Sequence, residues 1–184
     1  MTSPKNLDAD DIITFWLEAG PEAWFKRDDA FDQQLIDRFG DTHAQACSGA
    51  LDGWTETANG CLAIILLFDQ FSRNMFRGDA RAFDNDQTAR DLAIKMIDKG
   101  WDYQVDSRLR SFVYMPFMHS ESIVDQTRML ALSHECGGMN TLKYAIIHRD
   151  IIRRFGRFPH RNPVLGRRTT VAEQAFLDAG GFSA

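Results

Sequence analysis

Apolar side chains recur at steps of three and four residues along most of the chain, with polar positions between them. This spacing gathers the apolar residues on one face of a helix, and no stretch shows the period of two that a strand needs. The pattern predicts an all-α protein of about eight to ten helices. It is clearest in four stretches: Ile12, Trp16 and Ala19; Phe31, Leu35 and Phe39; Ala89, Ala93 and Met96; and Tyr144, Ile147, Ile151 and Phe155.

Glycines and short polar residues mark where these helices are expected to begin and end. Asp79 is predicted to cap a helix over residues 80–99 that Gly100 terminates. Thr170 and Glu173 have the spacing of a capping box ahead of a C-terminal helix. Further breaks are expected at Gly20-Pro21, Gly40-Asp41, Gly60, Gly78, Gly137-Gly138 and Gly180-Gly181.

The longest apolar run, Cys61 to Phe68, has eight residues, whereas a membrane-spanning helix needs roughly 18. We therefore expect this run to lie in a core and expect no membrane partner. The first residues are polar and lead into acidic ones, which is unlike a secretory signal. Cys47, Cys61 and Cys136 form neither disulfide nor zinc spacing, so we expect reduced thiols and a cytoplasmic protein.

The charge is distributed unevenly along a chain long enough for a single helical domain over residues 1–184. The net charge is −5, but residues 143–168 carry eight bases against Asp150 alone, whereas residues 1–60 carry twelve acids against four bases. The basic part can attract nucleic acid, a smaller anion or the acidic half of the same chain. Because no basic strand with interleaved aromatic residues is visible, we expect no nucleic-acid partner.

Candidate chemistry is concentrated in five short blocks that combine Arg, His, Asn or carboxylates with large apolar neighbours. Such polar groups are expected to be partly buried, where they must be paired or bind something. The blocks are Asp69-Gln70-Phe71-Ser72-Arg73-Asn74, His119-Ser120-Glu121, His148-Arg149-Asp150, Arg157-Phe158-Pro159-His160-Arg161-Asn162 and Leu165-Gly166-Arg167.

In the first block, Asp69, Arg73 and Arg77 follow one another at four-residue steps and would share a helix face. A guanidinium held by Asp69 could offer its remaining donors to a carboxylate or phosphate. The alternative is a structural ion pair that braces the helix end, with Asn74 as a cap.

In the second block, Ser120 is a candidate N-cap for the helix that carries Ile123. His119 and Glu121 could serve as catalytic acid and base, or as metal ligands, although a hydrogen-bonded structural histidine is the simpler interpretation. No close-set histidine pair is present, so no metal is predicted unless the fold joins His119, Glu121 and His148.

In the third block, His148 lies in line with Tyr144 and Ile152 and is expected to face inward, while Asp150 can pair with Arg154.

The last two blocks fall in a donor-rich loop over residues 156–169. Its functional interpretation is an anion clamp of arginines and loop amides. The alternative is a loop pinned to the acidic half by salt bridges. The clamp would use Arg157, His160, Arg161, Asn162 and Arg167.

Taken together, these blocks resemble a bacterial family of uncharacterised proteins, catalogued as domain of unknown function nine hundred and twenty-four. The resemblance runs from about Ile12 to Leu177. It implies a tetratricopeptide-repeat-like fold, in which antiparallel helical hairpins stack into a right-handed α-α superhelix, and it implies no activity. Ser72 departs from the family, which commonly has proline there. The motif positions that match are Asp69, Arg73, Asn74, His119, Glu121, Arg157, His160, Arg161 and Asn162.

Three functional hypotheses follow. In the first, the blocks meet in one groove that binds, and in a further step transforms, a small anionic metabolite. In the second, the chain is a peptide- or protein-binding module. In the third, the polar blocks are purely structural. The sequence indicates neither a cofactor nor an oligomeric state. For the first hypothesis, the catalytic candidates are His119 and Glu121, and the ligand-binding candidates are Asp69, Arg73, Asn74, Arg77, His148, Arg157, His160, Arg161, Asn162 and Arg167.

Overall fold

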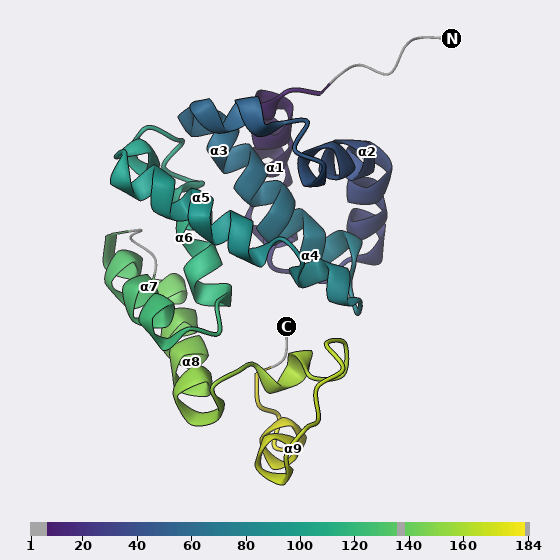
Figure 1. The fold of residues 1–184 in the computed structure, drawn as a ribbon, viewed down its shortest axis with the longest axis vertical. Coiled ribbons are helices and arrows are strands. Elements are labelled where there is room, and N and C mark those ends of the chain that lie inside the picture. Colours follow the sequence, from purple (N-terminus) through teal and green to yellow (C-terminus); the bar gives the residue numbers. More distant parts are fainter. Residues whose placement is uncertain (1–6, 136–138, 183–184) are drawn as a thin grey trace. The chain divides into compact units, whose positions relative to one another are not determined.

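The computed structural model describes residues 7–135 and 139–182, and every regular element within them is helical (Figure 1). The all-α prediction is therefore confirmed, and the described helices fall within the predicted number. None of them is long and apolar enough to cross a membrane. Their bounds are α1 Ala9–Trp24, α2 Asp29–Cys47, α3 Ala58–Ile65, α4 Ser72–Met75, α5 Asp86–Asp98, α6 Arg110–His119, α7 Ile123–Glu135, α8 Met139–Phe155 and α9 Val171–Asp178, with a π-helix at Leu66–Phe71 and 3-10 turns at Asp52–Glu56, Ala80–Phe83, Trp101–Tyr103 and Pro159–Arg161.

The chain divides into two compact units. Unit 1 comprises residues Met1–Arg77 and Arg81–Val113, and unit 2 comprises Gly78–Ala80 and Tyr114–Ala184. Unit 1 contains α1 to α5, unit 2 contains α7 to α9, and α6 contributes residues to both. A single domain and a superhelical array stay predictions.

The core of unit 1 is built around one long helical run, α3 followed by the π-helix and α4. All residues from Cys61 to Phe68 are buried, as the sequence predicted. The Trp16 ring lies 5.3 Å from the Phe71 ring and 5.6 Å from the Phe112 ring, measured between centroids. Each aromatic ring buried in this way contributes about 1.5 to 3 kcal/mol through the apolar area that it removes from water.

The π-helix changes the hydrogen bonding at the end of this run. The Ser72 N–H donates to the Leu67 carbonyl five residues earlier, and the Ser72 hydroxyl donates to the same carbonyl at 3.1 Å. Single turns of π-helix are frequent at functional sites because they redirect side chains within an otherwise regular helix. Here the turn fixes the hydroxyl of Ser72 inside the core, where the residue is fully buried.

In unit 2, α7 and α8 pack against each other (Figure 1). A small apolar core joins α8 to the loop and helix that follow. The core contains Ile151, Ile152 and Phe158, with Phe176 and Phe182 packed against it. Because Phe158 lies within the loop over residues 156–169, this core fixes the loop that carries Arg157, His160, Arg161, Asn162 and Arg167.

Two predicted helix starts are wrong. The helix expected over residues 80–99 begins at Asp86, with Asn85 at the N-cap position, so Asp79 does not cap it. The predicted run is interrupted at Asp84 and Asn85, which separate the 3-10 turn at Ala80–Phe83 from α5. At its other end, Gly100 terminates the helix in the left-handed conformation, with φ of 65°.

The helix α7 begins at Ile123, and the Asp125 N–H donates to the Ser122 hydroxyl, so Ser122 takes the capping role predicted for Ser120. Ser120 instead donates to the Asp125 carboxylate at 2.6 Å. The capping box of Thr170 and Glu173 at the start of α9 is confirmed.

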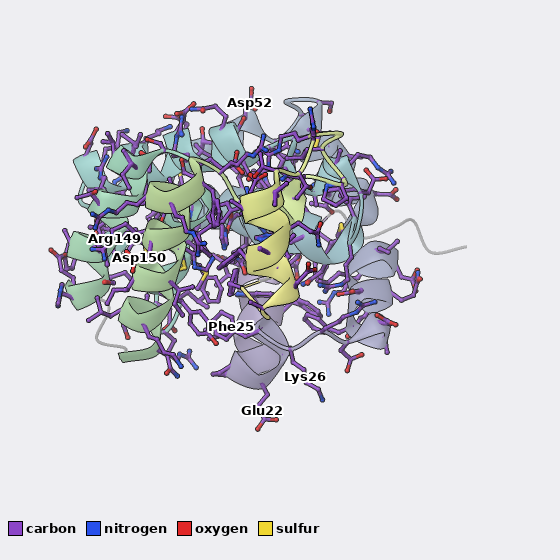
Figure 2. The ribbon with its side chains drawn as sticks, turned by 90° about the horizontal axis from the view of Figure 1, so that it is seen from below. Glu22, Phe25, Lys26, Asp52, Arg149 and Asp150 are labelled. Carbon is purple, nitrogen blue, oxygen red and sulfur yellow. The ribbon has the colours of Figure 1, made fainter. Side chains whose placement is uncertain are left out.

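Two expectations for α8 are also wrong. Tyr144 is 45% exposed, although the periodicity placed it on the inward face. Asp150 pairs with Arg149 at 2.8 Å, and Figure 2 shows both on the same helix. The expected partner, Arg154, lies over the Phe155 and Phe176 rings, because the guanidinium cation is attracted to the negative face of an aromatic ring.

Candidate functional site

Asp69 holds Arg73 in unit 1, as the four-residue spacing predicted. The Arg73 guanidinium donates to the Asp69 carbonyl at 2.7 Å and lies 3.3 Å from the Asp69 carboxylate. Asp86, which sequence reasoning missed, accepts a second hydrogen bond from Arg73 at 3.0 Å. Asp69 is 1% exposed. Arg73 is therefore preorganised, but two carboxylates already compensate its charge.

Arg77 forms a two-pronged pair with Asp32, at 2.7 and 2.9 Å, and donates to the Asn74 side-chain oxygen at 3.0 Å. Asn74 thus supports an arginine rather than a helix end. Asp32 carries no signal in the sequence, because it lies 45 residues from its partner. The residues predicted in the first block accordingly form an ion-pair network within unit 1.

In unit 2, Glu121 anchors the loop through three hydrogen bonds. It accepts from the Phe158 backbone N–H at 2.8 Å and from two Arg167 nitrogens at 2.7 and 3.0 Å. Burial alone would raise the pKa of Glu121, but these hydrogen bonds outweigh burial, so the pKa lies below its ordinary value. A carboxylate held as an anion in this way is a poor proton donor, and the geometry favours a positioning role over acid-base catalysis.

Arg157 joins the loop to α9. Its guanidinium donates to both oxygens of Glu173, at 2.6 and 2.9 Å, and to the Arg168 carbonyl at 2.8 Å. The hydrogen bond from Arg157 is the main reason that the pKa of Glu173 falls to about 2. Within unit 2, Glu121 and Glu173 are therefore the carboxylates that pair with Arg167 and Arg157 of the loop.

Histidines and aromatic rings form a cluster beside this loop. The His148 ring lies 6.3 Å from His119, 5.4 Å from Phe158 and 4.5 Å from Phe182, between centroids. The His160 ring lies 5.6 Å from Phe158 and 5.9 Å from Phe182. Phe182 follows a pair of glycines and belongs to no periodic pattern, so sequence reasoning missed it.

Both inner histidines of the cluster are neutral at pH 7. Burial is the main cause that lowers the pKa of His148 to about 3 and that of His160 to about 4, and the charge of Arg161 lowers both further. The His148 Nδ1 atom lies 2.8 Å from the Tyr144 carbonyl. Since a carbonyl only accepts, Nδ1 carries the proton and Nε2 keeps its lone pair.

The buried polar atoms of the loop that have no hydrogen-bond partner among the described residues include His160 Nδ1, Asn162 Oδ1 and Arg167 Nε. Asn162 is fully buried. Arg161 is also buried, and its guanidinium carbon lies 4.4 Å from the Phe158 ring centroid. These side chains come from one short segment that Glu121 and Phe158 hold in place.

The candidate residues thus fall into two groups. Unit 1 contains the network of Asp69, Arg73, Asn74 and Arg77, and a single groove that joins both groups stays a prediction. Unit 2 contains His119, Glu121, His148, Arg157, His160, Arg161, Asn162 and Arg167.

In the part of the chain that the structure describes, no three His, Cys, Asp or Glu side chains are grouped so that they could hold a metal ion.

Comparison with known proteins identifies a family but no function. A family model described as "bacterial protein of unknown function (DUF924)" matches residues 12–181. A solved protein of unknown function, ATU0120 from Agrobacterium tumefaciens, is similar over 94% of this chain and 97% of its own, with 48% identity and a TM-score of 0.89. No curated protein matches the chain.

Proposed function

Because the chain belongs to DUF924, a family of bacterial proteins of unknown function, we propose a function from the residues of unit 2 themselves. We propose that unit 2 binds a small oxyanion that also carries a hydroxyl group, such as a hydroxycarboxylate or a phosphate monoester. The observation that carries this proposal is the set of buried polar atoms in the loop that follows Phe158.

These atoms define the chemistry of the ligand. Arg167 Nε is a donor and Asn162 Oδ1 is an acceptor, and neutral His160 has one donor and one acceptor nitrogen, of which one interacts with the Phe182 backbone. A buried polar atom without a partner costs about 1 to 3 kcal/mol. A ligand with anionic oxygens and a hydroxyl group offers acceptors to Arg167 and a donor to Asn162, so it could remove this cost.

The charge of the segment supports an anion rather than a neutral ligand. Arginines occupy positions 157, 161, 167 and 168, whereas the carboxylates that contact this segment in the described hydrogen bonds are Glu121 and Glu173. The charge of Arg161 is felt at His148 and His160, where it lowers both pKa values. A positive field of this kind attracts anions.

The aromatic surroundings strengthen such binding. Phe158 is fully buried and lies against His148, His160 and Arg161. Hydrogen bonds formed beside apolar rings are electrostatically stronger than those in water, because the local dielectric constant is low. Neutral histidines can join such hydrogen bonds without the cost of a buried charge.

A thermal-shift screen tests the proposal. The panel contains hydroxycarboxylates, simple carboxylates, phosphate monoesters and inorganic phosphate, with each variant compared with its own ligand-free transition. We expect one anion class to raise the melting temperature of the wild-type protein and not that of Arg161→Gln. Ligand at a hundred times its dissociation constant stabilises the native state by about 2.7 kcal/mol, which is readily visible.

Arg77→Gln is the matched control, because it removes an arginine from an ion pair in unit 1 and should keep the shift. A shift that persists in Arg161→Gln would contradict the proposal. The absence of any shift across the panel would favour the purely structural or the partner-binding interpretation.

A further inference from the structure

A second candidate site, independent of the proposed function, lies in unit 1. A cavity of about 350 Å³ is bordered by the end of α2, the turn at Asp52–Glu56, α3 and the start of α5. Its volume is within the range of about 300 to 1,000 Å³ that small-molecule sites occupy. Part of the wall is apolar, formed by Leu51, Ile64, Phe68 and Leu92. The polar residues of the wall are Cys47, Asp52, Thr55, Asn85 and Thr88.

Cys47 is paired with a buried histidine one helical turn away. The Cys47 Sγ atom lies 3.6 Å from His43 Nδ1, within hydrogen-bond distance for sulfur. His43 is 5% exposed, whereas Cys47 is accessible at the end of α2. The thiol therefore faces the cavity from one side and contacts a potential base from the other.

Ser72 fixes the tautomer of that histidine. The Ser72 hydroxyl donates to the Leu67 carbonyl, so its oxygen must accept from His43 Nε2, which lies 2.8 Å away. Nε2 then carries the ring proton, and Nδ1 keeps a lone pair directed at the thiol. Thiol, imidazole and hydroxyl form a relay in which a nucleophile is adjacent to a base and the base is oriented by a third group.

Asn85 adds a donor at the thiol. It occupies the N-cap position of α5, yet its side chain caps no backbone N–H of that helix. The amide instead donates to Cys47 Sγ at 3.4 Å, from the wall of the cavity. An N-cap asparagine normally stabilises its helix by about 1 kcal/mol. In this orientation Asn85 does not provide that stabilisation, and its amide lies beside the sulfur instead.

The resting pair is neutral. Burial raises the pKa of the Cys47 thiol, and the charge of Asp84 raises it further. Burial lowers the pKa of His43. Attack by this sulfur therefore requires that the proton move to the imidazole during the reaction, and the lone pair on Nδ1 is placed to receive it.

We propose that Cys47 is the nucleophile of an acyl-transfer site whose substrate is a small, uncharged ester or thioester with an apolar acyl group. The sulfur attacks the carbonyl carbon while His43 Nδ1 takes the thiol proton. The leaving alcohol or thiol departs with that proton, which leaves a thioester on Cys47. Water then attacks the thioester, His43 takes a proton from the water, and the acid leaves as the proton returns to Sγ.

The surroundings select this substrate class. The apolar part of the wall suits an acyl chain, and the Asn85 amide can donate to the carbonyl oxygen as negative charge develops on it. Asp52 in the wall and Asp84 near the thiol disfavour an anionic substrate. Ser72 acts only through His43 and is a positioning residue.

The test uses the full-length protein with p-nitrophenyl acetate and p-nitrophenyl butyrate as probes. Release of p-nitrophenolate gives the acylation rate, and peptide mass mapping locates the acyl group. We expect a single acyl group on Cys47 of the folded protein and none at this position in Cys47→Ala. Cys61→Ala is the matched control, because the Cys61 thiol is buried and donates to the Thr55 carbonyl, so acylation should be kept.

Two further variants test the relay. His43→Gln should slow acylation by about a hundredfold, in the range of general-base catalysis. Ser72→Ala should lower the maximal rate at least about tenfold while leaving the half-saturating ester concentration unchanged, because Ser72 does not line the cavity. Acylation of other residues alone, a rate equal to that of the urea-unfolded chain, or full activity in Ser72→Ala would overturn the proposal.

Discussion

Histidine is used differently in the two units. In unit 1, His43 contacts a hydrogen-bonding partner through each ring nitrogen, Ser72 at 2.8 Å and Cys47 at 3.6 Å. In unit 2, His148 is fixed through Nδ1 to a backbone carbonyl, and His160 has a buried Nδ1 without a partner among the described residues. The first arrangement sets up one proton transfer, whereas the second leaves hydrogen-bonding capacity for a ligand.

The arginines among the predicted site residues, in contrast to the histidines, are used alike in the two units. Arg73, Arg77, Arg157 and Arg167 all contact carboxylates of their own unit. Their density in the sequence therefore reports ion pairs that hold the segments in place. The capacity for binding is better judged from which polar atoms remain without partners than from how many charged residues a segment contains.

The largest expected effect comes from Phe158→Ala, because Phe158 is fully buried beneath the histidine cluster. Truncation of a buried phenylalanine costs about 3 to 5 kcal/mol, measured as the free energy of unfolding in urea. It should also abolish the anion-induced thermal shift. Phe71→Ala in the core of unit 1 should cost a similar amount, but it should keep that shift. Loss of the shift in Phe71→Ala as well would mean that anion binding by unit 2 depends on the intact core of unit 1.

The next effect is the pH dependence of stability. The pKa values of His148 and His160, about 3 and about 4, lie below the ordinary value of 6.5, so the unfolded chain binds more protons than the native one between these values. The free energy of unfolding should therefore fall as the pH decreases from about 6.5 to about 4. His43 contributes with the same sign.

Denaturation curves at a series of pH values measure this slope. It should become shallower in His148→Gln, because glutamine does not titrate. An unchanged slope in His148→Gln would show that His148 is not held neutral by burial.

A smaller effect is expected for Glu121→Gln. The substitution keeps the shape of the side chain but removes the charge that pairs with Arg167. Loss of a charged hydrogen bond in a half-buried position should cost about 1 to 2 kcal/mol in urea denaturation. Because this pair holds the loop, the affinity for the anion should also fall. If Glu121→Gln bound the anion with the affinity of the wild-type protein but were less stable, the pair of Glu121 and Arg167 would hold the loop without contributing to anion binding.

The smallest effect is expected for Thr170→Ala, which removes the N-cap of α9. The Thr170 hydroxyl accepts from the Glu173 N–H at 3.3 Å. We expect a loss of about 1 kcal/mol. A melting temperature equal to that of the wild-type protein would contradict the energetic importance of this cap.

Much of the fold was predictable from the sequence, because local rules determine it. The period of the apolar residues identified the helices, the unbroken apolar run Cys61–Phe68 identified a buried segment, and the spacing of Thr170 and Glu173 identified the capping box. The start of α5 was not predictable from the glycine positions, because the break depends on Asp84 and Asn85. The π-helix at Leu66–Phe71 was missed as well, since its sequence contains no residue that marks a change from α-helical to π-helical hydrogen bonding.

The candidate site was predictable as a set of blocks but not as a set of partners. The spacing of Asp69 and Arg73 identified their pair because both lie on one helix. Glu121 and Arg167 pair across 46 residues, and His43 and Ser72 across 29, so only the folded chain reveals them. Cys47 was not predicted as a site residue, because a single thiol without a spaced partner resembles any other free cysteine.

The most direct test of the account is an NMR titration of the histidine side chains of the full-length protein, with inorganic phosphate and with malate as separate probes. Binding at unit 2 predicts saturable changes in the ring-nitrogen shifts of His160 and His148, with the His43 shifts unchanged. Saturable changes at His43 alone, or no saturable change at any of the three rings, would contradict the claim that unit 2 is the anion-binding site.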